Sequence, residues 1–306
     1  MIVKQIPEDF IVKERINLRF SKGSYSYFKL TKKDWNTSDA IKMIAERLGE
    51  KFDKFGYAGN KDRKGVTEQV ISVYNIHKER VENLNIRDIK LEFLGYGQER
   101  IHLGELEGND FIVTVRDLDR KVKIEKKKIK NYYDEQRFGI KKNNNQVGLA
   151  ILKKDFRKAC ELIDLEVNDN NYANALRKLN KKMLRFYIHA YQSHLFNQVL
   201  DKIKKNYKKI PIVGFLTKFK DKTVERLYLR LLKNDGLILR DFIIPALKEA
   251  GSEGGERDVY LHLTKLKVKW DNDELNEGKL KAVVSFNLNK GEYATVVIKS
   301  LFGKGI

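Results

Sequence analysis

The stretch that decides the interpretation of this chain is Ala58-Gly59-Asn60-Lys61-Asp62-Arg63-Lys64-Gly65-Val66-Thr67-Glu68-Gln69. It places one carboxylate, Asp62, among three cations and two glycines, directly before a run of strand-like composition that ends at Tyr74. Glycine lets a backbone approach a partner closely, and the cations would attract a polyanion. Because a carboxylate repels phosphate, the presence of Asp62 among these cations needs a separate explanation. It is either a structural acid paired with a neighbouring cation or a group that does chemistry on what the cations bring in.

The net charge of the chain favours a polyanionic partner. Its 306 residues include 62 lysines and arginines against 42 acids, which gives a net charge of +20. Such an excess creates a long-range field that attracts polyanions, of which nucleic acid is the commonest. The plentiful acids argue against a disordered basic tail. A lysine-rich proteome and a membrane-surface protein are the alternative explanations.

Cysteine content and hydropathy predict a cytoplasmic protein. Cys160 is the only cysteine, so the chain can form neither an intrachain disulfide nor a cysteine cluster around zinc. No apolar run approaches the roughly 18 residues that a membrane-spanning helix needs. The first five residues lack the apolar core of a signal peptide.

The first half of the chain alternates between strand and helix patterns. Strands are expected at residues 9–14, 25–30, 66–74, 89–94 and 110–115. A helix is expected at residues 38–48, because apolar side chains recur there on one helical face and Gly49 follows as a C-cap. A second, lysine-rich helix is expected at residues 121–135.

The second half suggests an interrupted domain. A polar break at residues 143–146 and a glycine-rich segment at residues 251–256 enclose a block whose pattern is mostly helical. Strand patterns return at residues 259–263, 282–287 and 293–298. We therefore expect a discontinuous domain of residues 1–151 and 259–306, with residues 152–258 inserted. The hairpin-bearing strands favour the α+β class over a parallel βαβ array.

Several chemistries lack the residues that they require. The chain contains no phosphate-binding G-x-x-x-x-G-K-[ST] loop, no G-x-G-x-x-G fingerprint and no G-x-S-x-G nucleophile elbow. His189 and His194 lie five positions apart, roughly 140° around a helix, which suits joint metal ligation poorly. What remains is a carboxylate that acts without a cofactor.

Motifs spread along nearly the whole chain carry a resemblance to a known family. They are Lys4-x-x-Pro7-Glu8-Asp9-Phe10, the Gly59–Gln69 stretch, His102-Leu103-Gly104 with Gly108-Asn109-x-Phe111, Asn131-Tyr132-Tyr133-x-x-Gln136-Arg137-Phe138-Gly139, Ala190-Tyr191-Gln192-Ser193-x-Leu195-Phe196-Asn197, and Gly291-x-Tyr293-Ala294-Thr295. In this order they resemble the tRNA pseudouridine synthase D (TruD) family. The residues Asn60 and Gly65 differ from those of bacterial members and resemble an archaeal or eukaryote-like branch of the family.

The resemblance implies a fold and a reaction. The fold is that of a pseudouridine synthase, with a mixed, largely antiparallel sheet flanked by helices and a mostly helical inserted TRUD domain. In the reaction, a uridine is detached from its ribose, turned over and rejoined through C5. This chemistry uses no metal, nucleotide or redox cofactor.

The resemblance also implies roles for individual residues. Asp62 matches the catalytic aspartate, and Lys4 matches its basic partner, whose charge would favour the ionised carboxylate. A uridine in folded RNA must be extruded before it can react, and an extruded base needs an aromatic platform. Phe10 and Tyr133 match the family's aromatic positions, the second of which is usually Phe. Asn131 would hold the uracil edge, and Lys61 and Arg63 would meet phosphates.

We therefore expect a tRNA pseudouridine synthase that modifies uridine-13 of the D arm. Its partner would be tRNA, with no membrane and no nucleotide cofactor, and we expect a monomer. Two alternatives stay open. One is a synthase that acts on another RNA position, such as the anticodon region. The other is a non-catalytic RNA-binding protein on the same scaffold.

Overall fold

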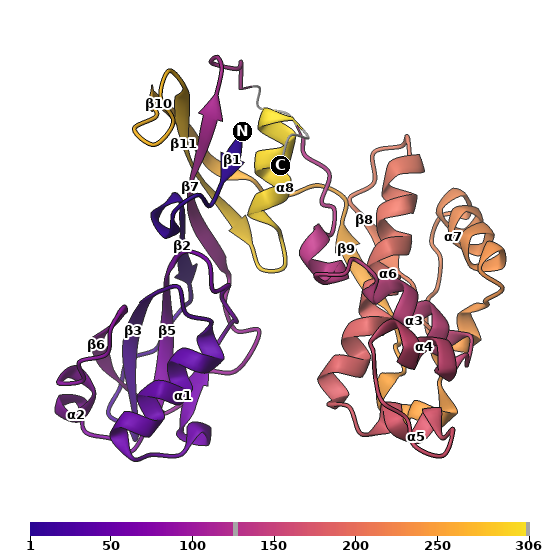
Figure 1. The fold of residues 1–306 in the computed structure, drawn as a ribbon, viewed down its shortest axis with the longest axis horizontal. Helices are drawn as coiled ribbons and strands as arrows, with labels where there is room; N and C mark the ends of the chain where they lie inside the picture. Colours follow the sequence, from indigo (N-terminus) through magenta and orange to yellow (C-terminus); the bar gives the residue numbers. More distant parts are fainter. Residues whose placement is uncertain (125–127, 304–306) are drawn as a thin grey trace. The chain divides into compact units, whose positions relative to one another are not determined.

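The computed structural model describes residues 1–124 and 128–303 and divides into two compact units. Unit 1 contains Met1–Lys127 and His262–Ile306, and unit 2 contains Lys128–Leu261. Unit 1 is therefore built from both ends of the chain, and unit 2 from a continuous middle segment (Figure 1). An insertion between two halves of one domain is thus present, as the sequence suggests.

Unit 1 is built on one sheet. Its described strands are β1 (Ile2–Val3), β2 (Phe10–Arg15), β3 (Tyr25–Lys33), β4 (Phe55–Tyr57), β5 (Val66–Tyr74), β6 (Ile89–Gly97), β7 (Gly108–Leu118), β10 (Thr264–Asn272) and β11 (Leu280–Asn289). The order is β10-β11-β7-β2-β5-β3-β6, with β1 beside β7 and β4 beside β5. Among the described strands only β2 and β5 pair in parallel. The mixed, largely antiparallel sheet confirms the α+β class.

Helices cover this sheet. They are α1 (Thr37–Leu48), α2 (Lys78–Glu82) and α8 (Ala294–Phe302), with short 3₁₀ turns η1 (Pro7–Asp9) and η2 (Phe52–Lys54). The N-cap of α1 is Asn36, whose side chain accepts from the Asp39 N–H, and its C-cap is Gly49, in the left-handed conformation. Its apolar face packs with Phe28, Leu30 and Ile71 of β3 and β5. Figure 1 shows α1 over this end of the sheet and α8 beside β11 at the other.

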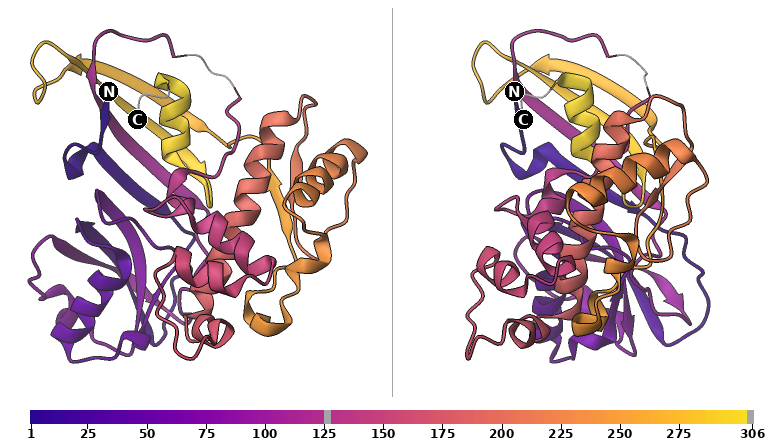
Figure 2. Two further views of the ribbon diagram at one scale, coloured as in Figure 1. Left: turned by 45° about the vertical axis from the view of Figure 1, so that its right-hand side comes forward. Right: turned by 90° about the vertical axis from the view of Figure 1, so that its right-hand side faces the viewer.

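Unit 2 is mostly helical, as expected. It contains α3 (Asn144–Leu152), α4 (Phe156–Leu162), α5 (Tyr172–Arg177), α6 (Lys181–Lys202), α7 (Lys222–Asn234), the 3₁₀ turns η3 (Glu135–Phe138), η4 (Leu239–Phe242) and η5 (Pro245–Ala250), and the strand pair β8 (Lys209–Ile212) and β9 (Gly255–Asp258). α6 is central, and α3 packs closely on it (Figure 2). A Cβ on Gly148 of α3 would lie 2.2 Å from the Tyr187 carbonyl oxygen. None of the described helices is long and apolar enough to cross a bilayer.

The unit boundary differs from the expected one at residue 151. The Asn131 N–H donates to the Val259 carbonyl at 2.9 Å, and the Leu261 N–H donates to the Ile129 carbonyl at 2.9 Å. These backbone bonds tie residues 129–131 to the end of unit 2, so the division falls after Lys127. The polar break at residues 143–146 leads into α3 within unit 2 and is not a linker. Asn131 and Tyr133 consequently belong to unit 2.

Three local predictions are wrong. Residues 121–124 and 128–134 form no helix, and residues 125–127 of that expected helix lie outside the described part of the chain. Residues 293–298 were expected as a strand, but Tyr293 is the N-cap of α8 and residues 294–298 lie in that helix, where burial of Val296, Val297 and Ile298 outweighs their β-branched preference. Residues 259–263 contribute one isolated bridge, at Tyr260, and the strand β10 follows instead.

A buried charge network fastens the N-terminal segment to the sheet. Arg116 of β7 is 3% exposed and contacts Asp9 at 2.9 Å, Asp273 at 2.7 Å and Glu274 at 3.0 Å. Burial opposes ionisation of Asp273, but hydrogen bonds from the Asp117 N–H, Asn276 and Arg116 outweigh it and lower its pKa. The network joins η1, β7 and the β10–β11 connection.

We predict that Arg116→Met lowers the free energy of unfolding by about 3 kcal/mol at pH 7, because it leaves Asp9 and Asp273 buried without their cation. A folded-state pKa below the unfolded value adds stability above about pH 4 that is lost as the pH falls. The difference from wild type should therefore shrink below pH 4. Urea unfolding of both proteins at pH 7 and at a pH below 4 measures this difference in the free energy of unfolding. Lys279→Met, which breaks an exposed pair with Asp119, is the control and should change the free energy of unfolding far less than Arg116→Met does.

Candidate active site

The parallel pairing of β2 with β5 brings the two expected catalytic segments together. Ile11 pairs with Val66 and Val12 with Thr67, so the turn before β5 lies beside the start of β2. Gly65 makes this approach possible: its φ is +141°, and a Cβ there would lie 2.5 Å from the Phe10 carbonyl oxygen. The turn that carries Asp62 is thus held against the segment that carries Lys4 and Phe10.

Lys4, Phe10 and Asp62 form one cluster. The Lys4 Nζ lies 3.7 Å from the Asp62 Oδ2 and 3.9 Å from the centre of the Phe10 ring. Lys4 adopts a φ of 62°, in the left-handed region that a non-glycine residue occupies at a cost in energy. Phe10 is 6% exposed, and its ring also packs edge-on against Phe111. In this structure the Phe10 ring supports the Lys4 ammonium group and is not presented to solvent.

The Asp62 carboxylate is accessible. Its side chain is 46% exposed, against 22% for Lys4. An ionised carboxylate beside a fixed cation, open to solvent on one side, can act as a nucleophile or as a general base toward a group that enters from solution. The geometry suits either role.

Buried polar side chains bind the backbone of the loop that carries Asp62 (residues 58–65, the Asp62 loop). The Gln69 Nε2 donates to the Gly59 carbonyl at 3.1 Å, and the Thr37 hydroxyl accepts from the Lys61 N–H at 2.9 Å. The Thr37 hydroxyl in turn donates to the Gln69 Oε1 at 2.8 Å. The Lys32 ammonium group donates to the Asp62 carbonyl at 3.4 Å. Three peptides of the loop are therefore fixed by side chains of β3, α1 and β5.

The two cations beside Asp62 have different environments. Lys61 is 7% exposed, and its ammonium group contacts Glu14 at 2.8 Å and donates to the Asn109 Oδ1 at 2.6 Å. Burial raises the pKa of Glu14, and the Lys61 charge opposes that rise. Arg63 is exposed and donates to the Asp34 carbonyl at 3.1 Å. Of the two, only Arg63 is exposed to solvent, and the Lys61 ammonium group is buried against Glu14 and Asn109.

Asn131 and Tyr133 belong to a second cluster, in unit 2, whose centre is Arg257 of β9. The Arg257 guanidinium carbon lies 4.1 Å from the centre of the Tyr133 ring. Its Nη2 donates to the Asn131 Oδ1 at 2.6 Å, and the Asn131 Nδ2 donates to the Asp258 carbonyl at 3.1 Å. Asn197 holds the Tyr133 backbone through both its N–H and its carbonyl. Asn131 is 2% exposed, so here it orients Arg257 over the ring.

The structure thus gathers Lys4, Phe10, Asp62 and Arg63 in unit 1, and Asn131 and Tyr133 in unit 2. Sequence reasoning missed Arg257 and the residues that hold the loop. The sequence does contain a signal for the residues that hold the loop. Lys32 follows Phe28 and Leu30 at alternate positions of β3, and Gln69 precedes Ile71 at an alternate position of β5, so both point inward. A polar residue at an inward strand position is the observation that could have found them.

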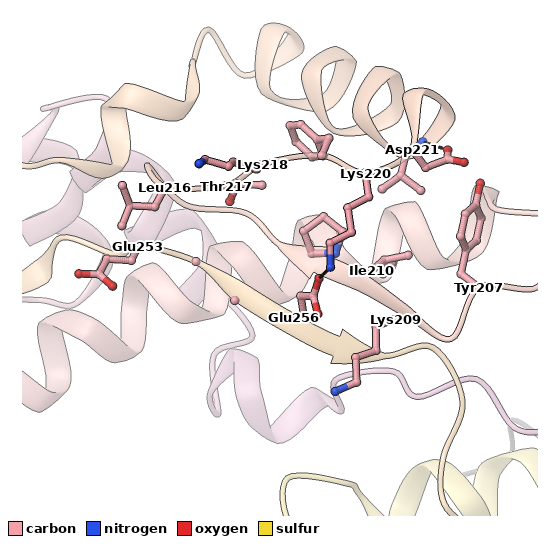
Figure 3. A pocket seen from close by; sticks show the side chains of 15 residues that line it. Tyr207, Lys209, Ile210, Leu216, Thr217, Lys218, Lys220, Asp221, Glu253 and Glu256 are labelled. Atoms are coloured by element: carbon pink, nitrogen blue, oxygen red, sulfur yellow. Dashed lines mark hydrogen bonds and ion pairs between the residues drawn. The ribbon is translucent and has the colours of Figure 1, made fainter.

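The described residues of unit 2 line hollows on its surface. One of about 210 Å³ is lined by Tyr133, Arg137, His189, Gln192 and Ser193, among others. A larger one, of about 410 Å³, lies between β8, the start of α7 and β9 (Figure 3). Three lysines and three acids line the larger hollow, and Lys220 pairs with Glu256 at 2.8 Å across it. Its lining therefore has no charge preference for a polyanion. The described residues contain no group of three or more His, Cys, Asp or Glu side chains placed to hold a metal ion.

Comparison with known proteins identifies the family. The model of the family described as tRNA pseudouridine synthase D (TruD) matches residues 1–164, 161–210 and 202–301. The chain belongs to the TruD family. Among curated relatives, "tRNA pseudouridine synthase D" of Aquifex aeolicus is 28% identical over 98% of this chain and 97% of its own length. "Probable tRNA pseudouridine synthase D" of Methanosarcina acetivorans is 27% identical over 97% of this chain and 91% of its own length.

A solved structure shows the same TruD fold. A crystal structure of the TruD protein from Methanosarcina mazei aligns with a TM-score of 0.77 at 24% identity, over 98% of this chain and 92% of that one. The agreement extends over both units, so the pseudouridine synthase fold with its helical insertion is confirmed.

We predict that Lys61→Met lowers the free energy of unfolding by about 3 kcal/mol, because Glu14 stays buried without its cation. The double variant Glu14→Gln/Lys61→Met should recover at least half of that loss, which double-mutant analysis of urea unfolding measures. The tRNA affinity of the folded double variant should equal that of wild type. A large loss of affinity in that variant would return Lys61 to the RNA-contacting residues.

Proposed function

We propose that this chain converts uridine to pseudouridine in tRNA, at position 13 of the D arm, with Asp62 as the catalytic group. The observation that carries the proposal is the ion pair between the accessible Asp62 carboxylate and Lys4, on a loop whose backbone is fixed. Membership of the TruD family supports the reaction type, and the relatives named above are tRNA pseudouridine synthases by description. The net charge of +20 supports an RNA substrate in the cytoplasm.

The reaction is an isomerisation and needs no other reactant. The bond between N1 of uracil and C1′ of ribose breaks, the base turns over, and a bond forms between C5 and C1′. The hydrogen on C5 leaves as a proton, and N1 gains one, so atoms and charge balance. The Asp62 carboxylate either attacks the sugar or abstracts a ribose proton, and both roles require its ionised form.

The neighbouring residues have roles that follow from their positions. Lys4 favours the ionised carboxylate, and Phe10 fixes the Lys4 ammonium group between ring and acid. Arg63 is exposed beside Asp62 and is the proposed phosphate contact. Tyr133 and Asn131 are proposed to act on the extruded base through Arg257, whose guanidinium lies over the Tyr133 ring and is oriented by Asn131.

We predict that Asp62→Ala abolishes turnover while tRNA affinity stays within about threefold of wild type, since the carboxylate adds no attraction for phosphate. Tritium release from tRNA transcripts labelled at uridine C5 measures turnover, because isomerisation must expel that hydrogen. Asp53→Ala, at an exposed acid of η2 in the same unit, is the matched control and should keep wild-type activity. Substantial activity in Asp62→Ala would remove Asp62 from the catalytic role.

The same assay decides between the alternatives. A transcript with cytidine in place of uridine-13 should release no tritium, whereas continued release would mean another position. Tight binding of tRNA without any release by the wild-type protein would identify a binding protein on the synthase scaffold.

We predict that Lys4→Met lowers the turnover rate well below that of wild type at pH 7, because the Asp62 carboxylate loses the ammonium group that lies 3.7 Å from it. The measurement is the rate of C5 tritium release at saturating tRNA. Lys13→Met, at a half-exposed lysine of β2 that pairs with Glu68, is the control and should keep the wild-type rate. A wild-type rate in Lys4→Met would exclude Lys4 from the proposed role.

A further inference from the structure

A lysine is buried directly beneath the Asp62 loop. Lys32 is 1% exposed and lies on β3, two residues beyond Leu30, on the face of the sheet that packs against α1. Side chains at alternate strand positions point to the same face, so Lys32 occupies a place where an apolar side chain would be expected. A charged group in such a place costs free energy unless it is paired. Its retention calls for a local reason.

The partners of Lys32 are backbone carbonyls. Its ammonium group donates to the Trp35 carbonyl, just before α1, and to the Asp62 carbonyl at 3.4 Å. No ion pair found among the described residues includes Lys32, in contrast to the buried Lys61, which contacts Glu14. The Lys32 charge is therefore directed at the peptide of the catalytic residue itself.

Few other charges face this ammonium group. On the same face of the sheet, β5 contributes Thr67 and Gln69, and β6 contributes Ile89 and Leu91, all of them uncharged. α1 contributes Thr37 and apolar side chains, while its Asp39 is exposed. The charged groups that act on Lys32 come from the loop: Asp62, which favours the protonated form, and Lys61, which opposes it.

The site contains a second hydrogen-bonding group, the Thr67 hydroxyl. Thr67 lies opposite Lys32 in the register of β3 and β5, so its side chain is on the same face. Its hydroxyl is buried and has no hydrogen-bond partner among the described residues. The Thr67 oxygen can accept from an ammonium group, and its hydroxyl can donate to a neutral amine, so Thr67 competes for the Lys32 nitrogen in both states. Loss of the proton removes one of the three N–H donors and the charge that strengthens the bonds to the Trp35 and Asp62 carbonyls, so the contact with Asp62 weakens.

We propose that Lys32 is a positioning residue for Asp62: its ammonium group holds the Asp62 peptide, and loss of its proton releases the loop and lowers turnover. The proposal rests on the catalytic role proposed for Asp62. It adds an alkaline limit to activity that is set by a residue which touches neither substrate nor reacting atoms.

Stability and activity should respond to this proton in opposite directions. Burial lowers the pKa of Lys32 to about 8, with a further lowering from Lys61 and an opposing effect of Asp62. Between about pH 8 and the ordinary lysine value near 10.4, the unfolded chain binds more protons than the folded one at this site. The contribution of Lys32 to stability therefore rises with pH across this window. A fall in activity there would not reflect unfolding through this group.

The test compares Lys32→Met with wild type by kcat and KM from C5 tritium release between pH 6.5 and pH 9.5. In wild type, kcat should fall above about pH 8 with KM nearly constant. In Lys32→Met, kcat should be at least tenfold lower at pH 7 and should lack that alkaline fall, while thermal stability is not reduced. Lys29→Met, on the same strand but half-exposed and paired with Glu92, is the control and should keep the wild-type kcat and profile.

The outcomes separate this proposal from the proposed function. If Asp62→Ala is inactive but Lys32→Met has the wild-type kcat and alkaline fall, the positioning role is overturned and the catalytic assignment stands. If the alkaline fall in kcat arises from ionisation of the substrate, it will appear in both wild type and Lys32→Met. That result also overturns the positioning role. If Lys32→Met does not fold, the wild-type protein with ¹³C-labelled lysine Cε decides. An NMR titration of Lys32 that coincides with the fall in kcat supports the proposal, and one that does not coincide overturns it.

Discussion

The candidate active site depends on the close parallel contact between β2 and β5. At this contact the Gly65 backbone lies against the Phe10 carbonyl, closer than any side chain would allow. Because the two strands run in the same direction, the segment before β2 and the turn before β5 meet at one edge. Lys4 and Asp62 are 58 positions apart in sequence, yet they form an ion pair there. β7 lies beside β2, and β3 lies beside β5, so both strands are fixed within the sheet.

The Asp62 loop shows how a fold can fix an exposed acid without burying it. The buried groups of Gln69, Thr37 and Lys32 act on the backbone of the loop, while the Asp62 carboxylate stays accessible. Buried polar side chains cost free energy unless they are satisfied, and here the peptides of the loop satisfy them. The loop thereby gains a defined geometry before any substrate arrives, which is the condition for efficient catalysis by position.

The sequence predicted much of the sheet but less of the site. Alternation and β-branched composition located β5 at its observed bounds and β2 to within a residue. The same composition misassigned α8, because burial against the sheet decides its conformation. Motif resemblance selected Lys4 and Asp62 as candidates, and the structure brings these two side chains together. The resemblance could not show that Lys61 is buried against Glu14, 47 positions earlier in the chain, or that Arg257 covers Tyr133, because both depend on long-range packing.

The two-segment construction of unit 1 has a consequence for synthesis on the ribosome. β7 pairs on one side with β2, which precedes it, and on the other with β11, which begins at Leu280. Until that strand emerges, one edge of β7 has unpaired backbone groups, and such an edge can pair with another chain. Unit 2 is continuous and is complete first. β10 and β11 are therefore added to the sheet last, because all of unit 2 is synthesised between β7 and these two strands.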